Sequence, residues 1–187
     1  MSFFSKFPVL ETERLRLREL RYEDGPDICA YFNEDVARYY DWWPATVADG
    51  RGFVRYFRHG YQEELSIRWA ITLKPSDKII GSCGFSDFYR FSLCELGYEL
   101  AKEYWGKGIM KEALQAIIPF GFNEIGIHRI QASVFPENQA SIRLLESLGF
   151  QKEGLLREFL YVKHRNQWED CVLLALLKSQ VEKEHAV

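Results

Sequence analysis

The sequence lacks the long apolar runs and the charge bias that mark membrane proteins and general nucleic-acid-binding proteins. No apolar run approaches the about 18 residues that a membrane-spanning helix needs. Basic and acidic residues number 24 and 27, a net charge of −3, which gives no electrostatic basis for direct nucleic-acid binding. The first residues have no long apolar core and no small-residue cleavage site. We therefore expect a cytoplasmic protein with no secretory signal and no membrane or nucleic-acid partner.

Metal-binding and disulfide patterns are also missing. The four cysteines, Cys29, Cys83, Cys94 and Cys171, are far apart, and no Cys-x-x-Cys occurs. The four histidines do not complete a zinc pattern with them. We expect buried thiols in a reducing compartment and no metal site.

Two familiar phosphate-binding motifs are absent, but a third arrangement is present. There is no G-x-x-x-x-G-K-[ST] and no G-x-G-x-x-G after a strand. Instead an extended apolar segment, Leu93–Leu100, leads through Gly106 and Gly108 into a helical pattern that begins near Ile109. The first amides of a helix have no intrahelical acceptor and can bind a phosphate. The alternative is an ordinary tight turn between a strand and a helix.

The order of predicted elements indicates one mixed α/β domain over 1–187, with its core at about 11–178. Strands are predicted at 12–20, 69–73, 79–89, 93–100, 129–135, 150–163 and 168–178. Helices are predicted at 26–32, 35–40, 46–60, 108–120 and 138–148, with Asp24, Thr46 and Gly149 as end signals. Pro119 should end or bend its helix, and a charged, frayed tail is expected from Glu182.

Four segments together resemble the GNAT superfamily of acetyl-CoA-dependent N-acetyltransferases. They are Glu95-Leu-Gly-Tyr-Glu-Leu100, Tyr104-Trp-Gly-Lys-Gly-Ile-Met-Lys-Glu-Ala113, Asn138-x-x-Ser141-x-x-Leu-Leu-Glu-x-x-Gly149-Phe150 and Glu169-Asp170. Within the superfamily they are similar to the ribosomal-protein N-terminal acetyltransferase (RimJ/RimL-like) branch. The resemblance implies a single-domain GNAT fold, with a mixed, mostly antiparallel sheet flanked by helices. It also implies that the sheet is splayed between the central strand and the strand that begins at Arg129.

The resemblance names acetyl-CoA as the cosubstrate and implies which residues bind it. These residues are Tyr98, Glu99, Leu100, Trp105, Gly106, Lys107, Gly108, Ile109, Met110 and Asn138. Trp105 stands where the superfamily usually has Gln or Arg, and Met110 replaces a small residue, so the fit around the pyrophosphate differs there. Asn138 has two alternative roles, holding pantetheine or capping its helix, and one residue could do both.

Two catalytic residues are implied by the same resemblance. Ser141 would be the acid that protonates the departing thiolate, against the alternative of an ordinary helical serine. Glu95 would be the base that takes a proton from the amine, with a pKa raised in a partly apolar cleft, against the alternative of a paired strand carboxylate. Glu99 and Glu158 are the next candidates. A direct base is not obligatory, because an N-terminal amine has a pKa near 8.

The acceptor is predicted to be a protein N-terminal amine, as on ribosomal proteins. The alternatives are a small amine (a polyamine or an aminoglycoside) and a non-catalytic acyl-CoA-binding module. Tyr40, Trp42 and Trp43 either wall the acceptor site or pack as an ordinary aromatic loop. The chain is expected to be a monomer or a homodimer.

Overall fold

A computed structural model describes residues 4, 6–42, 44–89 and 92–184. The strands are β1 (Leu10–Glu11), β2 (Leu15–Glu19), β3 (Ile67–Leu73), β4 (Ile79–Tyr89), β5 (Leu93–Leu100), β6 (Arg129–Val134), β7 (Gln151–Val162) and β8 (Gln167–Leu177). The α-helices are α1 (Gly25–Tyr31), α2 (Glu34–Ala37), α3 (Val47–Gln62), α4 (Ile109–Phe120), α5 (Gln139–Glu146) and α6 (Lys178–Glu184). No helix of the described residues is long and apolar enough to cross a membrane.

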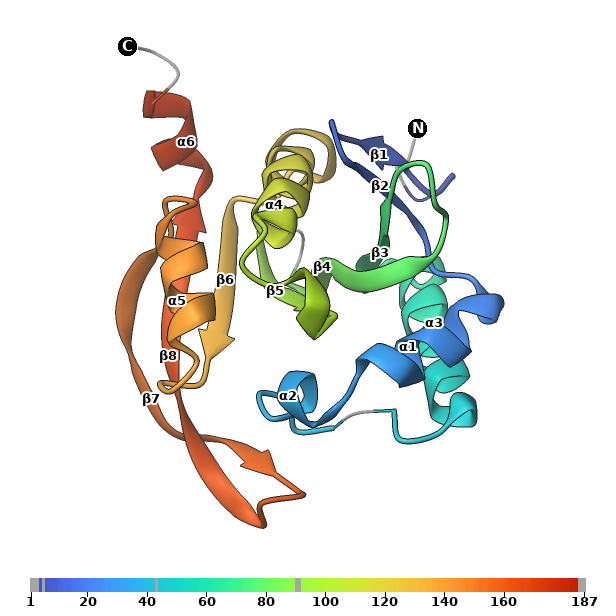
Figure 1. The fold of residues 1–187 in the computed structure, drawn as a ribbon. Coiled ribbons are helices and arrows are strands. Elements are labelled where there is room, and N and C mark those ends of the chain that lie inside the picture. Colours follow the sequence, from blue (N-terminus) through green and yellow to red (C-terminus); the bar gives the residue numbers. More distant parts are fainter. Residues whose placement is uncertain (1–3, 5, 43, 90–91, 185–187) are drawn as a thin grey trace.

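The strands form one sheet with helices on both faces (Figure 1). The strand order is β1-β2-β3-β4-β5-β6-β8-β7, and among these described strands only the β5–β6 pair is parallel. Successive side chains of a strand point to opposite faces. Trp69 and Ile71 of β3 belong to the cluster that contains α4 and α5, whereas Ala70 belongs to the cluster of α1, α2 and α3. The α4–α5 layer and the α1–α3 layer therefore lie on opposite faces.

The sheet opens between its two central strands, as predicted. β5 and β6 pair only where Leu93–Glu95 lies beside Arg129–Gln131. The remaining residues of β5 are paired with β4 on one side but have no strand partner on the other. This divergence leaves a gap in the middle of the sheet (Figure 1).

Of three residues considered as helix caps, Thr46 and Asn138 cap their helices with their side chains and Asp24 does not. Thr46 begins α3 with a capping box to Asp49, and Asn138 caps α5 by accepting from the Ser141 amide. Asp24 precedes α1 but makes no side-chain cap. Its carboxylate instead receives two hydrogen bonds of 2.8 Å from the Arg18 guanidinium. The prediction that Asp24 caps was wrong, because a buried ion pair competes for the same oxygens.

Three further predictions about boundaries need correction. A short β1 precedes the first predicted strand, and α2 begins one residue early, at Glu34, because Asn33 caps it. The predicted frayed tail is helical as far as Glu184. There the Gln180 side chain accepts from the Leu177 amide, which stabilises the start of α6. α4 ends at Phe120, next to Pro119, and a π turn follows over Gly121–Ile125.

Candidate active site

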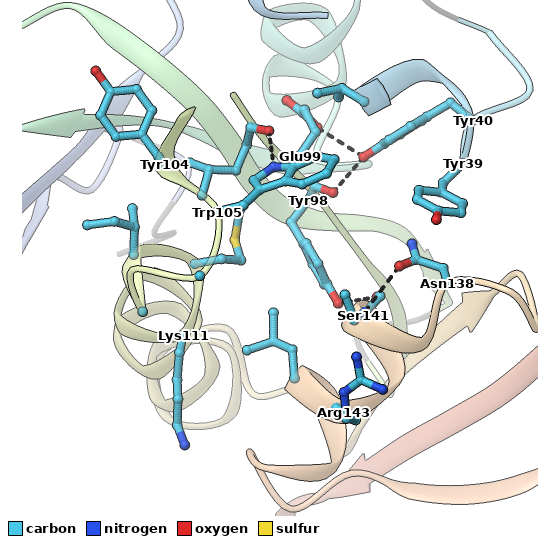
Figure 2. A pocket seen from close by; sticks show the side chains of 18 residues that line it. Tyr39, Tyr40, Tyr98, Glu99, Tyr104, Trp105, Lys111, Asn138, Ser141 and Arg143 are labelled. Atoms are coloured by element: carbon cyan, nitrogen blue, oxygen red, sulfur yellow. Dashed lines mark hydrogen bonds between the residues drawn. The ribbon is translucent and has the colours of Figure 1, made fainter. Parts of the chain in front are cut away.

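A cavity of about 530 Å³ lies at the gap between the diverging strands. Its walls come from α2 and the residues after it, the end of β5, the start of α4, and α5 (Figure 2). All the residues predicted to bind the cofactor line it except Lys107: Tyr98, Glu99, Leu100, Trp105, Gly106, Gly108, Ile109, Met110 and Asn138. Ser141 lines it too, whereas Glu95 does not. The fold thus gathers segments that are far apart in the sequence around one space.

The start of α4 forms a cradle of backbone amides at one end of this cavity. Gly106 and Gly108 have φ values of 69° and 73°, which L side chains rarely adopt. The Glu112 amide makes a helical bond of 3.0 Å to the Gly108 carbonyl, so the amides of 109–111 precede the helical hydrogen-bond ladder. These amides and the positive end of the helix dipole fit a phosphate.

A long-range ion pair fixes the cradle. The Glu112 carboxylate accepts from Arg14 Nε at 2.6 Å and from Thr12 Oγ1 at 2.5 Å. The same Arg14 guanidinium donates to the Lys107 carbonyl at 3.0 Å. The Lys107 side chain instead lies over the Tyr104 ring, 5.5 Å from its centroid. Lys107 therefore contributes to the cradle through its backbone.

The free edge of β5 presents backbone groups to the gap. The Ala101 amide donates to the Ile80 carbonyl, so Ala101 and, by alternation, Glu99 direct their backbone groups toward β4. Tyr98 and Leu100 consequently direct their amides and carbonyls toward the diverging side. Of the three β5 residues that the resemblance implied for cofactor binding, Tyr98 and Leu100 therefore present backbone donors to the gap, and Glu99 does not.

Ser141 is held at the opposite wall by two contacts. Its hydroxyl lies 2.5 Å from the Tyr98 hydroxyl, and its amide donates to Asn138 Oδ1 at 3.2 Å (Figure 2). Burial raises the pKa of Tyr98 to about 12, so the phenol is protonated at neutral pH. The helix cap uses only the side-chain oxygen Oδ1 of Asn138. The side-chain nitrogen Nδ2 of Asn138 has no hydrogen-bond partner among the described residues. Both predicted roles of Asn138 are geometrically compatible.

Glu95 lies on β5 outside the cavity lining and is engaged by β6. Its carboxylate accepts from the Ser133 amide at 2.7 Å and from Gln131 Nε2 at 3.1 Å. Burial nevertheless raises its pKa, partly offset by these donors. The raised pKa is the property that was predicted for a base, and the catalytic role remains a prediction. Glu158, the later alternative, lies on a bulge of β7, where its amide donates to Asp170 Oδ1 at 2.8 Å.

Glu99 belongs to a buried network on the α1–α3 face. Its carboxylate forms an ion pair with Arg68 and accepts from the hydroxyls of Ser82 and Tyr31. The Tyr40 hydroxyl lies 3.2 Å from its Oε2. The Glu99 side chain is fully buried, and the Arg68 side chain is 8% exposed. Since the carboxylate is so fully engaged, the network argues for an anchoring role of Glu99 rather than for a base.

Substituting Glu99 by Gln should destabilise the protein by about 3 kcal/mol, because it leaves the buried Arg68 without a counter-charge. Urea unfolding measures this loss. Lys102→Met is the control: it removes an exposed ion pair with Asp35 and should cost less than about 0.5 kcal/mol. Equal stability of Glu99→Gln and the control would contradict the ion pair.

The aromatic residues that follow α2 lie in two places, some on the cavity wall and one against α3. Tyr40 lines the cavity together with Tyr39, which the sequence had not singled out. Trp42 does not line it and stacks on Phe53 of α3, with centroids 6.5 Å apart and an angle of 6°. Trp42 therefore packs as a loop residue. Trp43 lies outside the described residues.

Two cations of the cavity were missed by the sequence reasoning. Lys111 comes from the first turn of α4, and Arg143 comes from α5 on the opposite wall (Figure 2). Helical spacing gave no signal for Arg143, because it lies two residues from Ser141 and five from Asn138, whereas neighbours on one helix face are three or four apart. Together with the amide cradle, these two positive charges on the cavity walls suit a ligand that carries several phosphates.

Single Cys→Ala substitutions should leave the acetyl transfer that the resemblance implies intact. Burial raises the pKa of Cys83 to about 12 and that of Cys171 to about 11, and it raises the pKa of Cys94 as well. These thiols are protonated at neutral pH and are poor nucleophiles. Thiol-release assays with each variant, with and without a chelator, check this. An acetylated cysteine that forms and decays during turnover, seen by mass spectrometry, would overturn it.

The comparisons with known proteins agree with this geometry. Residues 14–151 match the family model described as an acetyltransferase (GNAT) domain. The uncharacterized N-acetyltransferase p20 of Bacillus licheniformis is 39% identical over 175 residues, which are 92% of this chain and 97% of that protein. The ribosomal protein uS5-alanine N-acetyltransferase of Escherichia coli is 34% identical over 180 residues, 89% of each chain. The crystal structure of a ribosomal-protein-S5-alanine acetyltransferase from Vibrio fischeri superposes with a TM-score of 0.76 at 29% identity, covering 91% of this chain and 96% of that one.

The chain belongs to the GNAT family and is an acetyl-CoA-dependent N-acetyltransferase. The predicted fold is confirmed, and so is the similarity to the RimJ/RimL-like branch. The amide cradle, the two cavity cations and the donor edge of β5 fit the phosphates and carbonyls of this cosubstrate.

Proposed function

We propose that this protein transfers the acetyl group of acetyl-CoA directly to a protein N-terminal amine, of the kind found on ribosomal proteins. The observation that carries direct transfer is the cavity itself. It joins a phosphate cradle at the start of α4 to a donor edge on β5, and Ser141 lies on its wall. The acceptor class is supported by the similarity to the uS5-alanine acetyltransferase over 89% of the chain.

The reaction forms a C–N bond and an S–H bond and breaks a C–S bond and an N–H bond. The neutral amine nitrogen attacks the thioester carbonyl carbon, and the amides of Tyr98 and Leu100 face the edge where the oxygen gains negative charge. The new C–N bond remains, the C–S bond breaks, and the thiolate takes a proton from Ser141. The amine loses its proton to Glu95 through water, because Glu95 lies outside the cavity lining. Solvent then returns a proton to Ser141 and takes one from Glu95, so both residues regain their starting states.

A panel of acceptors tests this proposal. The purified protein is incubated with acetyl-CoA and one acceptor at a time, and released thiol and acetylated product are measured. The acceptors are a peptide that begins with alanine, the same peptide with a blocked N-terminus, a polyamine and an aminoglycoside. Both forms of the peptide contain lysine. We expect acetylation of the free peptide at its N-terminus and none of the blocked peptide, which still offers its lysine side chains.

Each other outcome assigns a different function. Transfer to the polyamine or the aminoglycoside alone would replace the proposal with small-amine acetylation. Acetyl-CoA binding seen by calorimetry, with no transfer to any acceptor, would indicate a non-catalytic acyl-CoA-binding module. A free peptide that reacts only at lysine would exclude N-terminal specificity.

A further inference from the structure

Two backbone carbonyls on the free edge of β5 receive hydrogen bonds from side chains. The Tyr40 hydroxyl donates to the Tyr98 carbonyl at 2.6 Å, and Trp105 Nε1 donates to the Leu100 carbonyl at 2.7 Å (Figure 2). The two donors come from the loop after α2 and from the turn before α4. The amides of Tyr98 and Leu100 face the same edge. The edge therefore has its acceptors engaged while its N–H donors face the gap.

We propose that Tyr40 is a positioning residue for acetyl transfer, because its hydroxyl engages the Tyr98 carbonyl and leaves the β5 edge as a surface of donors. Trp105 acts in the same way on the Leu100 carbonyl, two residues further along β5. The inference rests on the proposed direct transfer and adds a role for two side chains that do not touch the reacting atoms.

The physical reason is electrostatic. The thioester oxygen becomes negative during transfer, so N–H groups stabilise it and an unengaged carbonyl oxygen beside it would repel it. Such partial charges act more strongly in a cavity with little water. A donor on the Tyr98 carbonyl reduces that repulsion and also holds the peptide in place before the reaction begins.

The surroundings of Tyr40 keep its hydroxyl available as a donor. Burial and then the Glu99 carboxylate raise the pKa of Tyr40 well above its ordinary value, so the phenol keeps its proton. Glu99 Oε2 lies 3.2 Å from the same hydroxyl, but a phenol has a single hydrogen, and the shorter contact is to the carbonyl. Glu99 is already paired with Arg68, whose guanidinium lies 4.9 Å from the Phe57 ring centroid.

A matched pair of variants tests the role of this hydroxyl. Tyr40→Phe removes the donor from the β5 carbonyl and keeps the ring. Tyr31→Phe removes a hydroxyl that lies 3.1 Å from Oε1 of the Glu99 side chain and makes no contact with the carbonyls of the free β5 edge. The readouts are kcat, the KM for acetyl-CoA, and the infrared stretch of carbonyl-labelled acetyl-CoA bound to each protein. Thermal melts confirm that both variants are folded.

We expect Tyr40→Phe to lower kcat about tenfold while changing the KM for acetyl-CoA less than about twofold. The bound thioester stretch should lie at lower frequency than in water for the wild type and Tyr31→Phe, and closer to its value in water for Tyr40→Phe. An unchanged stretch and kcat in Tyr40→Phe would overturn the inference, and so would equal losses in both variants. Absence of acetyl-CoA binding to the wild type, seen by calorimetry, would overturn both the inference and the proposed function.

Discussion

Ser141→Ala is expected to lower kcat by about 10²–10⁴-fold, the usual contribution of a general acid. The thiolate needs a proton only as the C–S bond breaks, so cofactor affinity should change little. The substitution keeps the N-terminal cap of α5, because the backbone amide of residue 141, not its side chain, donates to Asn138. Steady-state thiol release gives kcat, and calorimetry with CoA gives the affinity.

Ser147→Ala is the control for the serine, because it lies at the other end of α5. Within the described part of the chain, its hydroxyl donates only to the Leu144 carbonyl. It should retain wild-type turnover. A Ser141→Ala enzyme with wild-type kcat would remove the acid assignment from this residue. The Tyr98 hydroxyl, 2.5 Å from Ser141 Oγ, would then be the next candidate.

Glu95→Gln should differ from Ser141→Ala in its pH profile. Burial raises the pKa of Glu95, so the wild-type rate should fall with decreasing pH at a higher pH than for an ordinary carboxylate. The loss in Glu95→Gln should be greatest at low pH, where the amine is charged. It should shrink as the pH approaches the amine pKa near 8, because free amine then needs no base. Equal, pH-independent losses in both variants would mean that both residues only support the cleft.

The parts of the site that the sequence predicted are local in the chain. The glycine turn before α4 and the Asn138 cap each lie within a few residues, where backbone preferences act directly. The opening of the sheet beside β5 came from the resemblance to the family, since pairing between distant strands leaves little trace in one sequence. The catalytic assignments of Glu95 and Ser141 also came from it and stay predictions.

The parts that the sequence did not predict join residues that are far apart. Arg14 meets Glu112, Arg68 meets Glu99, and the Tyr40 hydroxyl meets a carbonyl of β5. A charged or aromatic residue in isolation does not indicate its partner, because many pairings are compatible with one pattern of charges. The missing cap at Asp24 differs in range, since Arg18 lies only six residues before it, but there too the charge pattern alone does not name the partner.

Gly108→Asp should abolish the thermal stabilisation that CoA gives to the wild type. CoA stabilises the folded state by about 2.7 kcal/mol at 100 times its Kd, so the loss of binding is readily measured by a thermal shift. The substitution adds a carboxylate at a residue that lines the cavity directly before the cradle amides, and a Cβ there lies 3.6 Å from the Arg14 guanidinium. It thereby repels the phosphates and occupies their space.

The matched control for Gly108→Asp is Gly126→Asp. Gly126 also has a positive φ, 81°, and a Cβ there would meet nothing within 4 Å, so the two variants share the backbone strain and the added charge. Both should melt at lower temperature than the wild type without ligand, because Asp is strained at positive φ. Only Gly126→Asp should regain stability when CoA is added. If CoA raises the melting temperature of Gly108→Asp as much as that of the wild type, the phosphates bind elsewhere, because a carboxylate in the cradle has then not weakened binding.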